Sequence, residues 1–156
     1  MTSFKNKVIV VTGAASGIGL AICERFAKAG AALGLLDMDA ERLKAAEKKL
    51  CDGGVRCLSV PCDVSSRDAC NTAIGQILDH FGGIDVLVNN AGITQRSAFV
   101  DTDIAVFEKV MAVNFFGSLY CTKAAIHSLI ERKGLIIVNE SIAGIAPLLG
   151  RTGYSA

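Results

Sequence analysis

Short aliphatic runs alternate with longer amphipathic segments along the whole chain. Five of the runs are continuous rather than alternating, which is typical of strands buried on both faces of a parallel sheet. They cover residues 7–11, 33–36, 57–60, 84–88 and 135–139. Four segments between them space apolar residues at helical intervals and predict helices. These cover about 18–29, 40–50, 66–80 and 103–132. The alternation predicts a doubly wound α/β fold, an open parallel sheet with helices on both faces.

Polar residues mark where the predicted helices begin and end. Asp39 and either Ser65 or Ser66 precede helical segments and are suited to capping their first N–H groups. Gly30 and Gly134 stand where helices would stop. With no repeat and no Pro-rich linker, we expect a single domain over residues 1–156.

Composition and charge narrow the function classes. The 16 Lys and Arg residues nearly balance 15 Asp and Glu, a net charge of +1 that argues against a nucleic-acid binder or a polycationic membrane-surface protein. The 51% apolar content rules out disorder for most of the chain. No uninterrupted apolar run approaches the roughly 20 residues that span a bilayer, so we expect no membrane partner. With no export signal either, a cytoplasmic location is expected.

The six cysteines are scattered and include no CxxC pair. The nearest spacing, Cys57 to Cys62, has no matching Cys or His pair to complete a tetrahedral zinc site, so no metal site is predicted. In a cytoplasmic protein these thiols are expected to be reduced and to act as small apolar packing residues.

A glycine-rich turn joins the first predicted strand to the first helix. It reads Thr12-Gly13-Ala14-Ala15-Ser16-Gly17-Ile18-Gly19. Glycines allow a tight turn and a close approach of phosphate to the backbone, and the helix start presents free N–H groups to a pyrophosphate. A nucleotide-triphosphatase loop is excluded because Leu20 and Ala21 follow Gly19 where Lys and Ser or Thr are needed.

Asp37 ends the second predicted strand. A carboxylate there can accept hydrogen bonds from the ribose of an adenosine and would repel a 2′-phosphate. No Arg or Lys lies in the glycine turn or directly after Asp37, so NAD is favoured over NADP as the cofactor. The alternative is that Asp37 only begins a turn. Because Asp39 is the better placed cap, we expect Asp37 to be free for the ribose.

Together with later motifs, this turn gives a specific pattern. The chain resembles the short-chain dehydrogenase/reductase family, whose NAD(P)-binding domain is a Rossmann fold. The matching features are Thr12-Gly13-x-x-x-Gly17-x-Gly19, Asp63-Val64, Asn89-Asn90-Ala91-Gly92, Asn114, Ser141 and Tyr154.

The resemblance implies a set of cofactor contacts. Asp63 would accept from the adenine amino group, with Val64 lining the ring, although Asp63 also suits a turn after Pro61. The further cofactor residues would be Gly13, Ser16, Gly17, Ile18, Gly19, Asp37, Asn90, Ala91 and Gly92. The last three follow a central strand, at the sheet edge where open α/β folds bind ligands.

The resemblance also implies three catalytic residues. Tyr154 would exchange a proton with the substrate oxygen, while the Ser141 hydroxyl would fix and polarise that oxygen. Asn114 would support a water-linked proton relay; the alternative is a buried amide whose partners are purely structural. The implied function is hydride transfer between a nicotinamide cofactor and a secondary alcohol or ketone.

One element of the family pattern is missing. The family carries a lysine four residues after the tyrosine, and this sequence ends two residues after Tyr154. We therefore expect a chain that lacks the C-terminal strands and helices of the fold. A non-catalytic nucleotide-binding module or fragment stays as the alternative function.

The expected partners are a small carbonyl or alcohol substrate and, for the full-length form, further copies of the same chain. Five residues are expected to border the substrate and favour a partly apolar compound. They are Gln95, Arg96, Ala146, Leu148 and Leu149.

Overall fold

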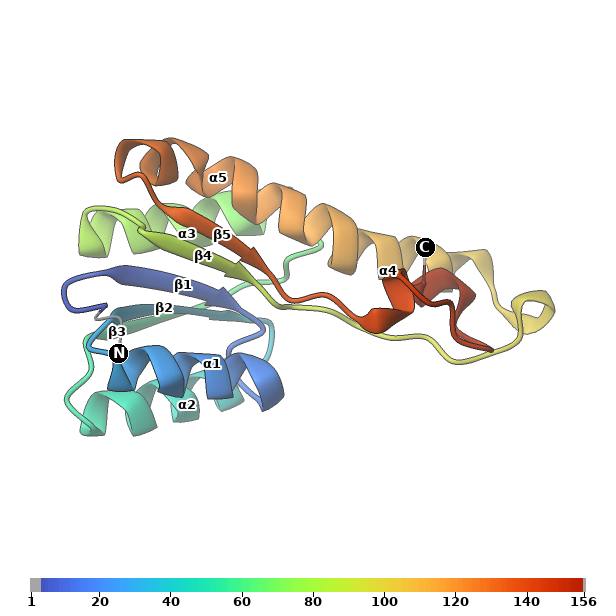
Figure 1. Cartoon of the computed structure of the whole chain (residues 1–156), viewed down its shortest axis with the longest axis horizontal. Coiled ribbons are helices and arrows are strands. Elements are labelled where there is room, and N and C mark those ends of the chain that lie inside the picture. The colour runs from blue at the N-terminus through green and yellow to red at the C-terminus, as the bar shows by residue number, and fades with distance from the viewer. Residues whose placement is uncertain (1–3, 156) are drawn as a thin grey trace.

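The computed structural model describes residues 4–155, which form a parallel sheet covered by helices on both faces (Figure 1). The strands are β1 (Val8–Thr12), β2 (Ala32–Asp37), β3 (Cys57–Pro61), β4 (Val86–Asn89) and β5 (Leu135–Val138). The helices are α1 (Gly17–Lys28), α2 (Ala40–Asp52), α3 (Arg67–Phe81), α4 (Ile104–Met111) and α5 (Gly117–Glu131). Three 3₁₀ turns cover Phe99–Asp101, Ile142–Gly144 and Thr152–Tyr154.

The strand order is β3-β2-β1-β4-β5, and every neighbouring pair is parallel. The chain therefore runs outward from β1 in one direction and then returns to build the other half of the sheet. This confirms the doubly wound α/β fold that the sequence pattern predicts. It also brings the carboxyl ends of β1 and β4 together at the point where the strand order reverses, which is the ligand-binding position in such sheets.

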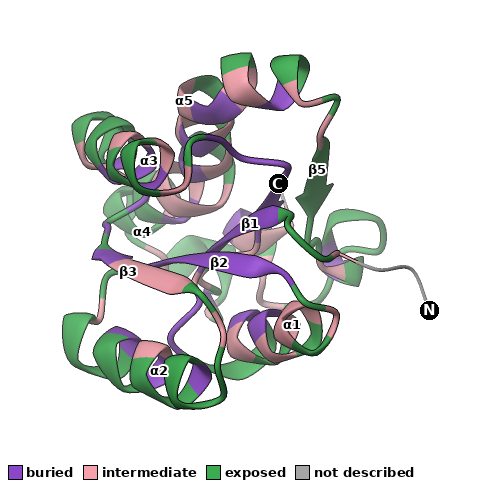
Figure 2. Ribbon diagram, turned by 90° about the vertical axis from the view of Figure 1, so that its left-hand side faces the viewer, coloured by how far each residue is buried: buried purple, intermediate pink, exposed green. Residues whose placement is uncertain are grey.

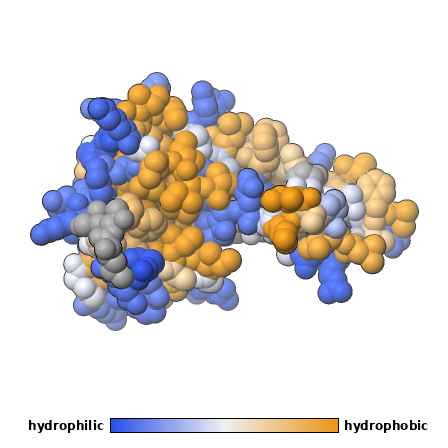
Figure 3. All heavy atoms as spheres, in the orientation of Figure 1, coloured by the Kyte–Doolittle hydropathy of each residue, from blue (hydrophilic) through white to orange (hydrophobic). Residues whose placement is uncertain are grey.

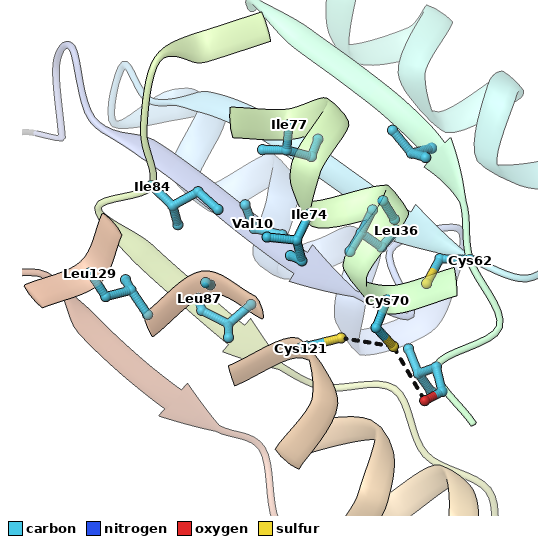
Figure 4. Packing of buried hydrophobic residues seen from close by; sticks show 14 residues of the cluster. Val10, Leu36, Cys62, Cys70, Ile74, Ile77, Ile84, Leu87, Cys121 and Leu129 are labelled. Carbon is cyan, nitrogen blue, oxygen red and sulfur yellow. Dashed lines mark hydrogen bonds between the residues drawn. The ribbon is translucent and has the colours of Figure 1, made fainter. Parts of the chain in front are cut away.

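The core has two parts, one on each face of the sheet. Ile9 and Val11 of β1 face α1 and α2, while Val10 faces α3 and α5. Successive residues of β1 thus point to opposite faces, and both faces are buried. Figure 4 shows the second part, where Val10 and Leu87 meet Ile74 and Ile77 of α3.

The expectation that every strand is buried on both faces is wrong for the two edge strands: in β3 only Val60 is buried, and β5 departs from the expectation furthest. All four of its residues are exposed (Figure 2), and Figure 3 shows hydrophobic atoms gathered over this edge. Within residues 4–155, β5 pairs with β4 alone and has little helix cover, whereas the other edge strand, β3, is packed against α2 and α3. The β5 sequence Leu-Ile-Ile-Val has the continuous apolar pattern of a central strand, so periodicity alone does not distinguish an edge from a centre.

The long helix predicted over 103–132 is interrupted. A π-helical turn at Ala112–Phe116 separates α4 from α5, and the N–H of Gly117 donates to the carbonyl of Ala112, five residues earlier. Single π turns inside α-helices are frequently found at functional sites. Asn114, the one predicted catalytic residue on this helix, lies within the turn.

The span Ile104–Glu131 is long and apolar enough to cross a membrane by length and composition, a test that core helices of soluble proteins also pass. In this fold α5 packs against α3, and Cys121, Ala125 and Leu129 of α5 are buried in the core.

The predicted caps at Asp39, Ser66 and Gly30 are confirmed, whereas the left-handed residue after α5 is Lys133 and not Gly134. Asp39 accepts the N–H of Arg42 at the start of α2, and Ser66, rather than Ser65, accepts that of Ala69 at the start of α3. Gly30 follows α1 with a φ of +87°, a left-handed conformation that favours glycine.

Candidate nucleotide-binding and catalytic site

The glycine turn packs too closely for side chains at two of its positions. A Cβ on Gly19 would lie 2.0 Å from the carbonyl oxygen of Gly13, and a Cβ on Gly13 would lie 3.0 Å from the Cα of Ala91. Gly13 also has a φ of +66°. These glycines allow α1 to begin directly against β1 and the loop after β4, leaving room for a ligand's phosphates beside the backbone.

The first turn of α1 has backbone N–H groups that can donate hydrogen bonds to a ligand. Its N-cap, Ser16, makes no side-chain cap hydrogen bond. Ser16, Gly17 and Ile18 are exposed, and 65% of Ile18 is accessible to solvent although it is a large apolar residue. The N–H groups at a helix start are a binding place for anions, so this exposed turn suits a pyrophosphate.

Asp37 lies beside this turn, as the prediction requires, but it is not free. One carboxylate oxygen accepts the N–H of Ala15 and the other accepts the N–H of Asp39, both at 3.0 Å. The expectation of an unengaged carboxylate is therefore wrong, because the end of β2 and the glycine turn share it. A carboxylate has about four acceptor positions, so two remain for the hydroxyls of a ribose.

Thr12 and Asn90 connect the glycine turn to the end of β4. The Thr12 hydroxyl accepts the N–H groups of Asn90 and Ala91, each at 2.9 Å. The Asn90 amide donates to the carbonyl of Thr12 and accepts from the Asn139 amide beyond β5. Thr12 and Asn139 were not among the predicted site residues. Thr12 stands at the head of the glycine motif, whereas nothing in the sequence marks Asn139.

Asn114 holds the segment that follows this turn. Its side-chain oxygen accepts the N–H of Ile93 at 2.9 Å, and its NH₂ group donates to the carbonyl of Ile93 at 3.0 Å. A Cβ on Gly92 would lie 3.4 Å from the Asn114 oxygen. The π turn thus brings Asn114 against the cofactor motif. These two hydrogen bonds are the structural partners that the alternative interpretation of Asn114 requires. Its role in a proton relay stays a prediction.

Asp63 and Val64 have separate environments. Asp63 is exposed, and one of its oxygens accepts both the N–H and the hydroxyl of Ser65, as a turn residue does. Val64 is buried against Gly117, where a Cβ would meet its side chain at 2.8 Å. The structure therefore gives Val64 a packing role, and the contacts of both residues with adenine stay predictions.

The two residues predicted for proton transfer lie on separate short turns. The Ser141 hydroxyl accepts the N–H of Ala143 and so caps the 3₁₀ turn after β5. Tyr154 ends the last 3₁₀ turn, with the Arg151 guanidinium 5.8 Å from the centre of its ring. Within residues 4–155 no hydrogen bond joins the side chains of Ser141 and Tyr154.

A hollow of about 560 Å³ lies between the loop after β4 and α4. It is lined by Ile93, Thr94, Gln95, Arg96, Ser97, Ala105, Val106, Lys109 and Val110. Two of the predicted substrate neighbours, Gln95 and Arg96, are among these residues; Ala146, Leu148 and Leu149 are not. Gln95 is buried, and its side-chain oxygen has no hydrogen-bond partner within the described chain.

Comparison with known proteins agrees with this geometry. The sequence model of a family described as short chain dehydrogenase matches residues 7–156. An 11-beta-hydroxysteroid dehydrogenase-like 2 of Arabidopsis thaliana is 40% identical over 153 residues, which cover 97% of this chain and 50% of that protein.

Solved structures superpose closely. An NAD⁺-bound xylitol dehydrogenase has a TM-score of 0.94 at 35% identity, over 99% of this chain and 60% of that one. An alcohol dehydrogenase of Thermococcus sibiricus, complexed with 5-hydroxy-NADP, has a TM-score of 0.93 at 31% identity, over 96% and 64% of the two chains. The chain thus spans about half to two thirds of the length of these proteins. On the strength of the family match over nearly all its residues, the chain belongs to the short chain dehydrogenase family.

Proposed function

We propose that this chain carries the nucleotide-binding part, and the predicted serine and tyrosine, of an NAD-dependent oxidoreductase that interconverts a secondary alcohol and a ketone. The observation that carries the proposal is the convergence of the glycine turn, Asp37 and the Asn90 loop at the carboxyl edge of the sheet. Proteins that match this fold closely were solved with NAD⁺ or an NADP analogue.

The residues present fit a dinucleotide. The uncapped start of α1 offers N–H donors to the pyrophosphate, and the tight contact between Gly13 and Gly19 keeps side chains away from it. Asp37 would hold the adenosine ribose, while Asp63 has an unengaged oxygen for the adenine amino group. When bound, the nicotinamide of the cofactor supplies or accepts the hydride.

The preference for NAD rests on charge at the end of β2. Asp37 would face the 2′ position of the ribose, where a carboxylate repels the phosphate of NADP. The glycine turn contains no Lys or Arg that would compensate this repulsion.

Three residues would act on the substrate. Tyr154 would donate a proton to the substrate oxygen during reduction and remove one during oxidation, while Ser141 would donate a hydrogen bond to the same oxygen. Asn114 would support the proton supply from its position in the π turn. The hollow between the loop after β4 and α4, whose lining includes Arg96 and Lys109, would border a small carbonyl or alcohol substrate.

The test of cofactor choice is a titration of the chain with NADH and NADPH, followed by fluorescence. We expect NADH to bind more tightly. Asp37→Asn removes the charge and keeps one of the two acceptor oxygens for the backbone, so the preference for NADH should narrow by roughly tenfold, about 1.4 kcal/mol. Asp79→Asn, an exposed carboxylate on α3, is the matched control and should change nothing. An unchanged preference in Asp37→Asn would contradict the assignment.

The test of catalysis is NAD-linked turnover of secondary alcohols. Loss of turnover in Tyr154→Phe with unchanged NADH binding supports the assignment. NADH binding without turnover in the parent protein supports the alternative, a nucleotide-binding module.

A homo-oligomer is also proposed, because large apolar side chains stay exposed along the helix from α4 to α5. They are Ile104, Val106, Phe115, Phe116, Leu119 and Ile130. Sedimentation of the protein tests this, and a monomer at micromolar concentration would contradict it. The cytoplasmic location stays a prediction.

A further inference from the structure

Two cysteines from different elements lie side by side at the amino end of the outer strand β3. Cys51 is in the last turn of α2 and is exposed, while Cys57 is the first residue of β3 and is half-buried. Their sulfur atoms are 2.6 Å apart. By contrast, the buried thiols of Cys70 and Cys121, in the core on the other face of the sheet, are 3.6 Å apart (Figure 4).

The pairing follows from how α2 lies along β3. The Glu47 carboxylate accepts both the N–H and the hydroxyl of Ser59, each at 2.8 Å, which fixes the position of the helix relative to the strand. Cys51 is four residues after Glu47 on the same helix face, and Cys57 is two residues before Ser59 on the same strand face. The two hydrogen bonds from Ser59 to the Glu47 carboxylate therefore place the thiols of Cys51 and Cys57 next to each other.

The connecting loop allows the two sulfurs to meet. Residues 52–56 include Gly53 and Gly54, and Gly54 has a φ of +80°. The remaining cysteines are less accessible: Cys23, Cys62, Cys70 and Cys121 are all buried. Accessibility thus separates one pair from the other four thiols.

We propose that Cys51 and Cys57 form a site of reversible oxidation, at which hydrogen peroxide converts the two thiols to a disulfide that fastens α2 to the edge strand β3. The Cys51 sulfur attacks the peroxide O–O bond, giving a sulfenic acid and one water. The Cys57 sulfur then displaces the hydroxyl from that sulfenic acid, which leaves as a second water once protonated. Two thiols lose two electrons and two protons, and one hydrogen peroxide becomes two waters.

The order of the two steps follows from exposure. Burial, and then the hydrogen bond with Cys51, raises the pKa of the Cys57 thiol to about 12, so Cys57 is a poor first nucleophile. The exposed Cys51 meets the oxidant first. The pair lies at the amino end of β3, whereas Asp63 follows the carboxyl end, so the disulfide should leave nucleotide binding unchanged.

The experiment treats the reduced full chain with hydrogen peroxide, blocks free thiols with iodoacetamide, and digests it with trypsin. Cleavage after Lys49, Arg56 and Arg67 gives one peptide of residues 50–56 and another of 57–67. The expected product is these two peptides joined, two hydrogens lighter than the sum of the 50–56 peptide and a 57–67 peptide blocked at Cys62 alone. The midpoint temperature of thermal unfolding should rise by about 5–8 °C on oxidation, because closing a loop removes entropy from the unfolded chain, and dithiothreitol should reverse the rise.

Two variants sharpen the result. Cys57→Ser should abolish both the joined peptide and the thermal shift. Cys62→Ala, the matched control that removes the other cysteine of the second peptide, should keep both. Separate alkylation of Cys51 and Cys57 after peroxide treatment overturns the proposal, and so does a bond from Cys51 to Cys62. A joined peptide without a thermal shift overturns the fastening of α2 to β3. None of these readouts depends on the proposed enzymatic function.

Discussion

Asn90 donates two hydrogen bonds to Thr12 and so joins the loop after β4 to the end of β1. The Asn90 N–H donates to the Thr12 hydroxyl oxygen at 2.9 Å, and the Asn90 side-chain NH₂ donates to the Thr12 carbonyl at 2.9 Å. Thr12 is 2% exposed, so the contact is screened from water. The relationship fixes the glycine turn relative to the loop that follows β4.

Replacing Thr12 by Val should lower the free energy of unfolding by about 2–3 kcal/mol, because two backbone N–H groups lose their acceptor. Urea unfolding followed by circular dichroism measures this. Thr12→Ser keeps the hydroxyl and should lose less than about 1.5 kcal/mol. Equal losses in the two variants would contradict this account, because the hydroxyl would then contribute no more than the methyl group.

Gly19→Ala should destabilise the chain by about 3 kcal/mol or more, because its Cβ would lie 2.0 Å from a backbone oxygen. Binding of NADH should be lost with it. Gly75→Ala is the control inside α3, where a Cβ meets nothing within 4 Å. That change should stabilise by about 0.5–1 kcal/mol through helix propensity. Calorimetry of both variants checks the contrast, and a mild effect at Gly19 would refute the packing argument.

Asn114→Ala should free the backbone of Ile93, which exchanges two hydrogen bonds with the Asn114 side chain. We expect a loss of about 2–3 kcal/mol and faster hydrogen exchange at the Ile93 amide. Ser118→Ala removes one hydroxyl contact to the Asn114 carbonyl and should cost about 1 kcal/mol or less, with no change at Ile93. If hydrogen exchange at the Ile93 amide is unchanged in Asn114→Ala, the Asn114 side chain does not hold this segment in place.

Asp85 is a buried carboxylate at the amino edge of the sheet. It lies 2.8 Å from Lys7 and 3.3 Å from Arg132, and it accepts the N–H of Val8. Burial acts to raise its pKa, but the hydrogen bonds from Lys7 and Val8 and the charges of Lys7 and Arg132 outweigh it, so the pKa of Asp85 is lowered.

A lowered pKa makes the contribution of Asp85 pH-dependent. It is fully present above the unfolded value of about 3.9 and is lost as the pH falls through the lower folded value. Asp85→Asn should therefore cost about 2–3 kcal/mol near pH 7. The difference from the parent should shrink as the pH falls below about 4. Unfolding midpoints between pH 7 and pH 2.5, compared with those of the exposed-site variant Asp79→Asn, measure it; a pH-independent difference would contradict the ion-pair account.

Sequence patterns were sufficient wherever local chemistry decides the structure. Gly13 and Gly19 lie where no side chain fits, and Asp39 and Ser66 cap helices with their own side chains. The contact of Asp37 with Asp39 is the turn that the sequence offered as an alternative, whereas its contact with Ala15 was missed because the two residues are 22 positions apart. Exposure of β5 depends on what lies beside it, which its four aliphatic residues do not encode.

The π turn and the pair of Cys51 and Cys57 also could not be predicted from the sequence pattern. A helical pattern over 103–132 does not register one extra residue in a turn, because apolar spacing tolerates three or four. Cys51 and Cys57 show no metal or redox motif in the sequence. Their proximity arises from the contact of Glu47 with Ser59, which is a property of the assembled α2 and β3.

The π turn also determines where the long helix tolerates a change in its length. The π turn holds one residue more than an α-helical turn, so removing one residue from 112–116 would convert it to an ordinary α-helical turn. Cys121, Ala125 and Leu129 would then keep facing the core. Each residue of a regular α-helix advances it by about 100°, so removing one residue from α5 before Cys121 would instead turn these three side chains away from the sheet. The π turn is therefore the place in this helix where a change of one residue leaves the buried face unchanged.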